Sequence, residues 1–157
     1  MDTPVAVLGG LAIAANAVIY GTDVFGAIVL RPAVAAVDDR TLTQLLGHVH
    51  RIADRRIAAI AISGLITAVA MTALAAVSGH RLSTAAGALA VLALIAFSTV
   101  YTRISKPVNA ALTAAALADR VPDDARRLQA RWNSVINARV ALQTVALAAL
   151  CVGLAAA

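Results

Sequence analysis

VAVLGGLAIAANAVIYGTDVFGAIVL, residues 5–30, is an apolar run that contains a single charged side chain, Asp23. A run of this length can form a helix that crosses a bilayer, for which about 20 residues are needed. An ionised carboxylate in hydrocarbon costs several kcal/mol, and such residues usually face the protein interior and have a function. The segment therefore predicts a membrane-spanning helix, with Asp23 as the first candidate functional residue.

The whole chain has the composition of a membrane protein. Of its 157 residues, 61% are hydrophobic and 13% are charged, whereas soluble proteins are roughly half apolar and about a quarter charged. The apolar content comes mainly from Ala, Leu, Val and Ile, and small residues favour close helix packing in bilayers. The basic residues lie between the apolar runs without interleaved aromatic residues, so we expect no nucleic-acid partner despite the net charge of +5.

Three further apolar segments are long enough, or nearly so, to cross a membrane. We therefore expect one domain, residues 1–157, with an all-α, integral membrane, up-down four-helix bundle fold. Pro32 is expected to end the first helix, and the helical spacing that follows it predicts a cytoplasmic helical extension of the second span. Pro122 and Asp123 predict a helix start. The predicted spans are residues 5–30, 57–77, 85–104 and 135–157.

The basic residues also predict the orientation of the chain. Five Lys and Arg residues lie in the first connection and six in the third, against Arg81 alone in the second. By the positive-inside rule, the first and third connections are cytoplasmic and both termini lie outside. The N-terminus lacks the basic region of a cleaved signal peptide, so we expect the first span to be retained, in a bacterial inner (plasma) membrane.

Polar residues recur at helical spacing on each span. Asn16, Tyr20 and Asp23 share one face of the first helix, because positions i, i+4 and i+7 align. One polar stripe on each of four helices can enclose a polar or mixed cavity. Asp23 and Arg139 lie roughly 12 Å and roughly 10 Å inside the basic side, at about 1.5 Å per residue, so we expect them to meet. The other stripes are Arg56, Ser63 and Thr67; Ser98, Thr102, Ser105 and Asn109; and Trp132, Arg139 and Gln143.

Two interpretations of these polar residues remain open. Asp23 either takes protons or binds a cation opposite an arginine that holds an anionic substrate, or it forms a buried ion pair with Arg139 that locks two helices together. The Ser and Thr residues can instead satisfy only their own backbone carbonyls, and Asn or Gln can bridge helices. Both interpretations predict that Asp23 and Arg139 are neighbours.

The segment GHVHRIADRR, residues 47–56, resembles a two-histidine, one-carboxylate iron set. His48 and His50 point to opposite sides of a helix, since they are roughly 200° apart, whereas His50 and Asp54 share a face. His50 and Asp54 can be metal ligands, or the carboxylate can fix the imidazole tautomer for acid–base chemistry, or they form an ordinary surface pair. The cofactor is therefore expected to be a bound metal ion or none. No nucleotide-binding loop, HExxH motif or Ser nucleophile elbow occurs in the chain.

Three groups of residues carry a family resemblance. They are Gly21 and Phe25 followed by Pro32, then KPVN at residues 106–109, then RWNSVINAR at residues 131–139. Together they resemble the anthrone oxygenase-like family of small four-span membrane proteins, largely a family of unknown function, over most of the chain. The most specific part of the resemblance is the combination of Pro107, Asn109, Trp132, Asn137 and Arg139.

The resemblance implies a membrane oxidoreductase, a monooxygenase that oxidises the doubly benzylic carbon of a lipophilic phenol such as an anthrone to a ketone. A phenol would reach the bundle from the membrane, a carboxylate or histidine would remove a proton, and amide and guanidinium donors would hold the developing oxyanion. Trp132 would stack on the substrate or anchor the helix at the interface. The candidate catalytic residues are Asp23, His50, Asn109 and Arg139, and the candidate substrate-binding residues are Tyr20, Trp132 and Asn137.

Two other functions fit the same residues. In a small carrier or channel-like module, Asp23 and Arg139 would gate a proton or an ion, with water access through a homo-oligomer as one arrangement. In a structural or accessory membrane subunit, the polar stripes would serve packing alone, and a partner would supply the chemistry. The expected partners are a lipophilic small molecule and membrane lipid.

Overall fold

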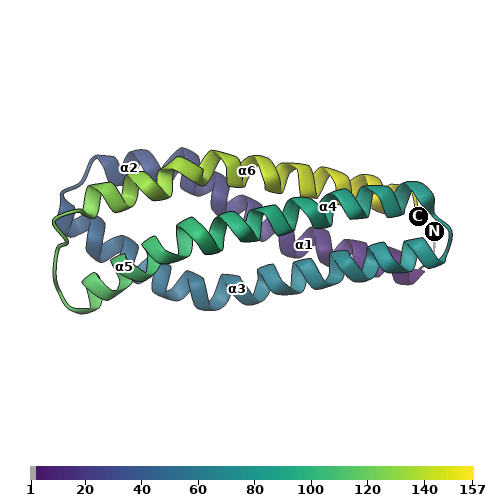
Figure 1. Cartoon of the computed structure of the whole chain (residues 1–157), viewed down its shortest axis with the longest axis horizontal. Helices are drawn as coiled ribbons and strands as arrows, with labels where there is room; N and C mark the ends of the chain where they lie inside the picture. Colours follow the sequence, from purple (N-terminus) through teal and green to yellow (C-terminus); the bar gives the residue numbers. More distant parts are fainter. Residues whose placement is uncertain (1–2) are drawn as a thin grey trace. The chain divides into compact units, whose positions relative to one another are not determined.

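The structure is a computed structural model that describes residues 3–157. The described residues form α-helices and two short π-helical segments, with no strands, which confirms the predicted all-α fold. Figure 1 shows the helices, coloured along the sequence. In chain order the elements are α1 (Thr3–Phe25), η1 (Gly26–Leu30), α2 (Arg31–Ala35), α3 (Asp39–Val77), α4 (Arg81–Val100), η2 (Tyr101–Ser105), α5 (Lys106–Leu117) and α6 (Ala125–Ala155).

Four continuous helical segments are long and apolar enough to cross a membrane, which supports an integral membrane protein. The helical bundle predicted from the apolar runs is confirmed, and α3 begins at Asp39, so the expected helical extension before the second span is also confirmed. The helix start expected at Pro122 and Asp123 lies slightly further along, at Ala125. The four segments are Thr3–Ala35, Asp39–Val77, Arg81–Leu117 and Ala125–Ala155.

The prediction that Pro32 ends the first helix is wrong. The helix continues to Ala35 because it widens into a π-turn immediately before the proline: the Arg31 N–H donates to the carbonyl of Gly26, five residues earlier. Proline has no N–H to donate and its ring clashes with the carbonyl four residues before it in a regular α-helix, which the wider turn relieves. The same device precedes Pro107, where the Lys106 N–H donates to the carbonyl of Tyr101.

The chain divides into two compact units, each built from parts of all four membrane-spanning segments. The first unit comprises residues 1–21, 59–97 and 141–157. Its core is made largely of small side chains, as expected for helices that approach closely in a bilayer. The prediction of a single domain stays a prediction. The buried core residues of the first unit are Val5, Ala12, Ala68, Met71, Ala75, Ala90, Ala93, Leu94, Ala146, Ala149 and Leu150.

The second unit comprises residues 22–58 and 98–140 and has its own core of larger side chains. Within it, α3 and α5 pack tightly at Gly47, where an added Cβ would lie 2.4 Å from the Cβ of Ala116 and 2.5 Å from the Leu112 carbonyl oxygen. Only glycine fits this crossing without a shift of one helix. The core residues are Val34, Leu42, Leu46, Val108, Leu112, Ala125, Trp132 and Ile136.

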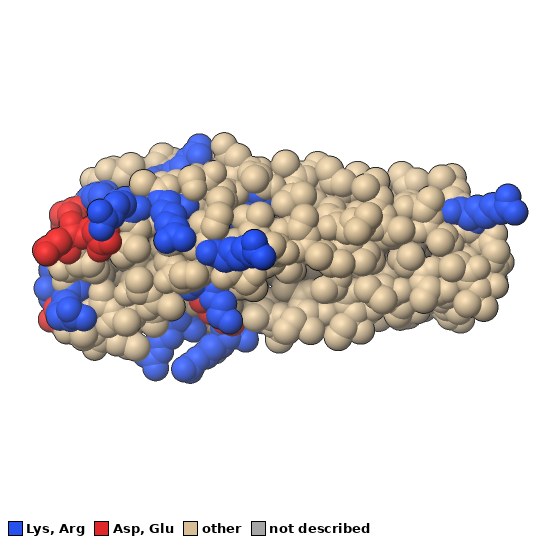
Figure 2. Space-filling view, viewed as in Figure 1, with Lys and Arg blue, Asp and Glu red and all other residues tan. Residues whose placement is uncertain are grey.

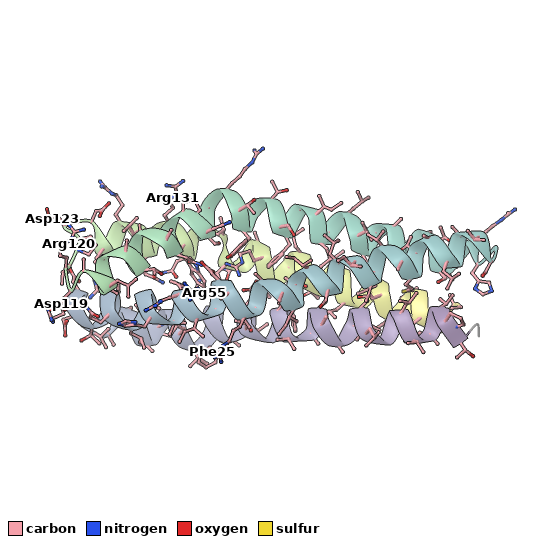
Figure 3. The ribbon with its side chains drawn as sticks, turned by 90° about the horizontal axis from the view of Figure 1, so that it is seen from below. Phe25, Arg55, Asp119, Arg120, Asp123 and Arg131 are labelled. Atoms are coloured by element: carbon pink, nitrogen blue, oxygen red, sulfur yellow. The ribbon has the colours of Figure 1, made fainter. Side chains whose placement is uncertain are left out.

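The second unit carries nearly all of the charge. Of the 13 Lys and Arg residues, only Arg81 belongs to the first unit, and every described aspartate belongs to the second. Figure 2 shows the charged side chains among the uncharged ones. The connection between α5 and α6 is especially rich in them, and Figure 3 shows Asp119, Arg120 and Asp123 together there.

Candidate functional site

The second unit contains a buried ion pair between α1 and α6. Asp23 is 2% exposed and Arg139 is 7% exposed. The guanidinium donates to both carboxylate oxygens, from Nη2 to Oδ1 at 2.5 Å and from Nε to Oδ2 at 3.2 Å. Its third nitrogen, Nη1, donates to the Ser105 hydroxyl of η2 at 2.9 Å. This two-pronged geometry is the strong form of an arginine–carboxylate contact, and it joins three helices.

Two aromatic rings flank the guanidinium. The Arg139 Cζ atom lies 5.4 Å from the centroid of the Trp132 ring and 5.8 Å from that of the Tyr101 ring. Trp132 is seven residues before Arg139 on α6, so both side chains lie on one helical face. At these distances the negative faces of the rings attract the buried cation and replace part of its lost hydration.

A second polar network joins α3 to η2 and α5. The Asp54 Oδ1 atom accepts a hydrogen bond from the Tyr101 hydroxyl at 2.7 Å and another from the Asn109 amide at 2.9 Å. Because Tyr101 contacts both Asp54 and Arg139, the two networks are continuous, and all four membrane-spanning segments contribute to one polar cluster.

His50 completes the cluster from α3. The side chain is buried, and its ring centroid lies 5.9 Å from that of Trp132, with the two planes inclined by 38°. Three buried polar atoms here have no hydrogen-bond partner: His50 Nε2, Trp132 Nε1 and Asn109 Oδ1. Since buried polar atoms are almost always paired, three unpaired atoms on residues of one polar cluster are candidates for binding a polar group.

The structure brings together most of the residues predicted for the site. Six predicted residues form the cluster in the second unit: Asp23, His50, Asp54, Asn109, Trp132 and Arg139.

Asn137 and Tyr20 do not belong to the cluster. The expectation that Asn137 binds substrate stays a prediction: its side chain is exposed, and position 137 is five residues after Trp132, roughly 140° around the helix. Tyr20 is half-buried and belongs to the first unit. Phe25, part of the family resemblance, is 53% exposed and points away from the helices in Figure 3.

The histidine geometry agrees with the prediction from the sequence. His48 is exposed, whereas His50 is buried, so the two lie on opposite sides of α3. Within residues 3–157, no three His, Cys, Asp or Glu side chains form a group that could hold a metal ion. His50 and Asp54 would thus supply two protein ligands, and Asp54 Oδ1 already accepts two hydrogen bonds. A metal ion at this pair stays a prediction.

Several polar residues in the predicted stripes bond only their own helix. The hydroxyls of Ser63, Thr67 and Thr102 donate to backbone carbonyls three or four residues earlier. For these three the alternative interpretation, self-satisfied hydroxyls, is confirmed. Arg56 is exposed and also lies outside the cluster.

Tyr101 is the site residue that the sequence pattern did not reveal. It begins the π-helical segment η2, in which hydrogen bonds span five residues, and it reaches Asp54 and Arg139 from the side of the helix that also carries Ser105 and Asn109. Ser105 and Asn109 are buried while Thr102, which the regular spacing placed with them, is exposed. The sequence feature that indicates the irregular helix here is Pro107, because a proline disturbs the helical turn just before it.

Comparisons of the chain with models of known protein families, with curated proteins and with solved structures find no match. The geometry of the polar cluster and the sequence resemblance are therefore the basis for a functional proposal.

Proposed function

We propose that this protein is a membrane-embedded oxidoreductase that oxidises a lipophilic phenol of the anthrone type, with the polar cluster of the second unit as its site. The observation that carries the proposal is that three residues of this cluster have unpaired buried atoms, and that the ring of one of them, Trp132, contacts the Arg139 guanidinium. The atoms are His50 Nε2, Trp132 Nε1 and Asn109 Oδ1. Trp132 Nε1 is a hydrogen-bond donor, Asn109 Oδ1 is an acceptor, and His50 Nε2 is an imidazole nitrogen that can take a proton. Together these groups can bind and deprotonate a phenol.

His50 is the proposed base, in preference to Asp23. Both oxygens of Asp23 accept hydrogen bonds from Arg139, whereas His50 Nε2 has no partner and can take a proton. The Trp132 N–H would donate to the substrate oxygen, and the buried positive charge of Arg139 would stabilise the anion that forms. Asn109 Oδ1 would accept a hydrogen bond from a second hydroxyl.

The proposed overall reaction converts a doubly benzylic CH₂ group and O₂ into a ketone and water. Both C–H bonds break, one oxygen atom becomes the carbonyl oxygen, and the other leaves as water with the two hydrogens. The carbon loses four electrons and dioxygen gains them. Removal of the first proton is the step that the chain's residues assist, because the resulting anion, whose charge is shared between the benzylic carbon and the conjugated oxygen, reacts with O₂ more readily than the neutral molecule.

The proposal includes an orientation. The two connections within the second unit are cytoplasmic, both termini lie outside, and the membrane is a bacterial inner membrane. The support is the charge distribution, with Arg81 as the one basic residue of the first unit. The site then lies toward the cytoplasmic side of the bilayer, which a lipophilic substrate reaches from the lipid.

The test is oxidation of anthrone by the protein reconstituted in lipid nanodiscs, followed as O₂ consumption and anthraquinone absorbance. We expect one O₂ consumed per anthrone and a rate lower by about 10²–10⁴-fold in His50→Ala, the usual contribution of a positioned base. His48→Ala is the matched control, because His48 lies on the opposite, exposed side of the same helix. Equal rates in the two variants, or no oxidation above that of empty nanodiscs, would exclude this function.

A structural or accessory role is the second candidate, and one observation favours it. Arg139 uses its three guanidinium nitrogens on Asp23 and Ser105, so the ion pair is fully occupied without a ligand. A pair of this kind fixes the register of α1 against α6. In that case, replacing both charged partners by apolar residues would leave the protein folded and its partner binding unchanged.

A further inference from the structure

The outer face of α3 carries a basic hollow that is separate from the polar cluster. The hollow has a volume of about 350 Å³ and is lined by His48, Arg51, Ile52, Arg55 and Arg56, here called the α3 basic hollow. Its three arginines are exposed, and Arg55 is labelled on α3 in Figure 3. Because these positions are three or four residues apart, their side chains share one side of the helix.

The charge of the hollow is not neutralised within the protein. None of the guanidinium groups of Arg51, Arg55 and Arg56 has a hydrogen bond or an ion pair among the described residues. Other exposed arginines do have carboxylate partners, as Arg40 has Asp119 and Arg127 has Asp124. Like charges three or four residues apart repel one another and destabilise a helix, so an external anion would stabilise this segment.

The hollow also has an apolar component and lies at the start of an apolar helix segment. Ile52 lines it, and Leu45, Val49 and Ile52 are 46%, 40% and 55% exposed on α3. The uncharged, apolar part of α3 begins at Ile57, directly after the arginines. Basic clusters at this level meet the headgroups of a bilayer, where an anionic lipid offers both a phosphate and acyl chains. A free inorganic anion would make no use of the exposed apolar side chains.

We propose that the α3 basic hollow binds the phosphate of an anionic phospholipid. The guanidinium groups of Arg51, Arg55 and Arg56 donate to the phosphate oxygens, and Ile52 contacts the acyl chain near the glycerol. Arginine suits this role because its planar fork of donors matches phosphate oxygens. The lipid would neutralise the repulsion between the arginines and hold the start of the apolar segment of α3 at the membrane surface.

The test is lipid binding to the full chain in detergent, measured by native mass spectrometry during titration with phosphatidylglycerol or phosphatidylcholine. We expect phosphatidylglycerol to bind at least about tenfold more tightly, since each basic residue near an anionic headgroup contributes about fivefold. By the same arithmetic, the triple variant Arg51→Gln, Arg55→Gln, Arg56→Gln should bind phosphatidylglycerol on the order of 100-fold more weakly. Equal affinity of the wild-type chain for the two lipids would overturn the proposal.

A matched control removes the same charge elsewhere. Arg103, Lys106 and Arg131 are exposed and lie outside the hollow, so their triple Gln variant should weaken phosphatidylglycerol binding by less than about fivefold. Equal losses in the two triple variants would mean that binding follows total charge and not the hollow. Should the first triple variant fail to fold, Arg55→Gln alone should show a loss of about fivefold, and an unchanged affinity would overturn the proposal.

A second arm separates the lipid from a free anion. Inorganic phosphate, added at the concentration that saturates phosphatidylglycerol binding, should not displace the lipid, because it makes no contact with Ile52. Displacement at that concentration would show that the hollow binds a soluble anion instead. Neither arm depends on oxidation of a phenol, so failure of this proposal leaves the proposed function intact, and the reverse also holds.

Discussion

At the scale of single residues, the buried pair of Asp23 and Arg139 should dominate the energetics of the second unit. Removal of one partner from a buried ion pair leaves an uncompensated charge, which usually costs about 3–5 kcal/mol. We therefore expect Asp23→Asn to lower the free energy of unfolding by about 3–5 kcal/mol, measured by denaturant titration in mixed micelles. Asp124→Asn is the control, because its pair with Arg127 is solvent-exposed and such pairs contribute about 0–1 kcal/mol.

The double variant Asp23→Leu, Arg139→Met separates structure from function. Apolar residues of similar volume often replace a buried pair without loss of stability, so this variant should unfold close to the wild-type value. If the cluster is a catalytic site, anthrone oxidation should nevertheless be lost, because the cation beside Trp132 is gone. If the double variant is as unstable as Asp23→Asn, the ion pair itself stabilises the fold. In that case the loss of stability in Asp23→Asn does not come only from leaving Arg139 as an unpaired buried charge.

The hydrogen bonds of Asp38 predict that the stability of the first turn of α3 depends on pH. Its carboxylate accepts hydrogen bonds from the Thr41 backbone N–H at 2.8 Å and from the Thr41 hydroxyl at 2.9 Å, as a residue capping the helix N-terminus does. These bonds lower the pKa of Asp38 below its usual 3.8. Because the pKa of Asp38 is lower in the folded than in the unfolded state, ionised Asp38 stabilises the folded protein fully above about pH 4. This stabilisation is lost as the pH falls through the folded-state pKa of Asp38.

The measurement is an NMR titration of the Asp38 carboxyl carbon. Thr41→Val removes only the hydroxyl and should raise the pKa part of the way back toward 3.8, because the backbone N–H still donates. Asp38→Asn should abolish the pH dependence of amide-exchange protection in the first turn of α3. An unchanged Asp38 pKa in Thr41→Val would contradict the assigned hydrogen bond.

At the scale of elements, the π-helical segment η2 decides which side chains reach the site. Tyr101, Ser105 and Asn109 meet Asp54 and Arg139 on one side of the helix, and the π-turn rotates the residues before it relative to those after it. The cause is Pro107, which cannot continue a regular α-helix without a clash. Substitution of Pro107 should therefore affect the polar cluster by rotating η2, although Pro107 itself need not contact the cluster residues.

We expect Pro107→Ala to restore α-helical hydrogen bonding and to rotate Tyr101 and Ser105 away from Arg139. The chain has one tryptophan, so the fluorescence of Trp132 reports on the cluster alone. Loss of the packed neighbours should shift its emission to longer wavelength. Pro122→Ala, in the connection before α6, is the control and should leave the emission unchanged. An unchanged spectrum in Pro107→Ala would mean that η2 persists without the proline.

The elements also show where inference from the sequence alone succeeds. The four spans and the partnership of Asp23 with Arg139 could be predicted, because apolar length and the depth of a charge along a helix are local properties of the chain. Tyr101 was not predicted, because the i, i+4, i+7 spacing favoured Ser98 and Thr102, whereas a π-turn changes the register of the residues before it relative to those after it. Asn137 was favoured by the resemblance alone; it lies roughly 140° from Trp132 around α6, and its role stays a prediction.

At the scale of the whole molecule, the charge asymmetry predicts a measurable topology. Cys151 is the single cysteine, so Cys151→Ser gives a background without thiols in which one reporter can be placed at a time. We expect Ser78→Cys, in the turn between α3 and α4, to react with a membrane-impermeant maleimide in intact spheroplasts. Asp123→Cys, in the connection between α5 and α6, should react only after the membrane is opened. The reverse pattern would place the basic connections outside. Labelling of both sites in intact cells would mean that the protein inserts in both orientations, so that the polar cluster lies toward either side of the bilayer.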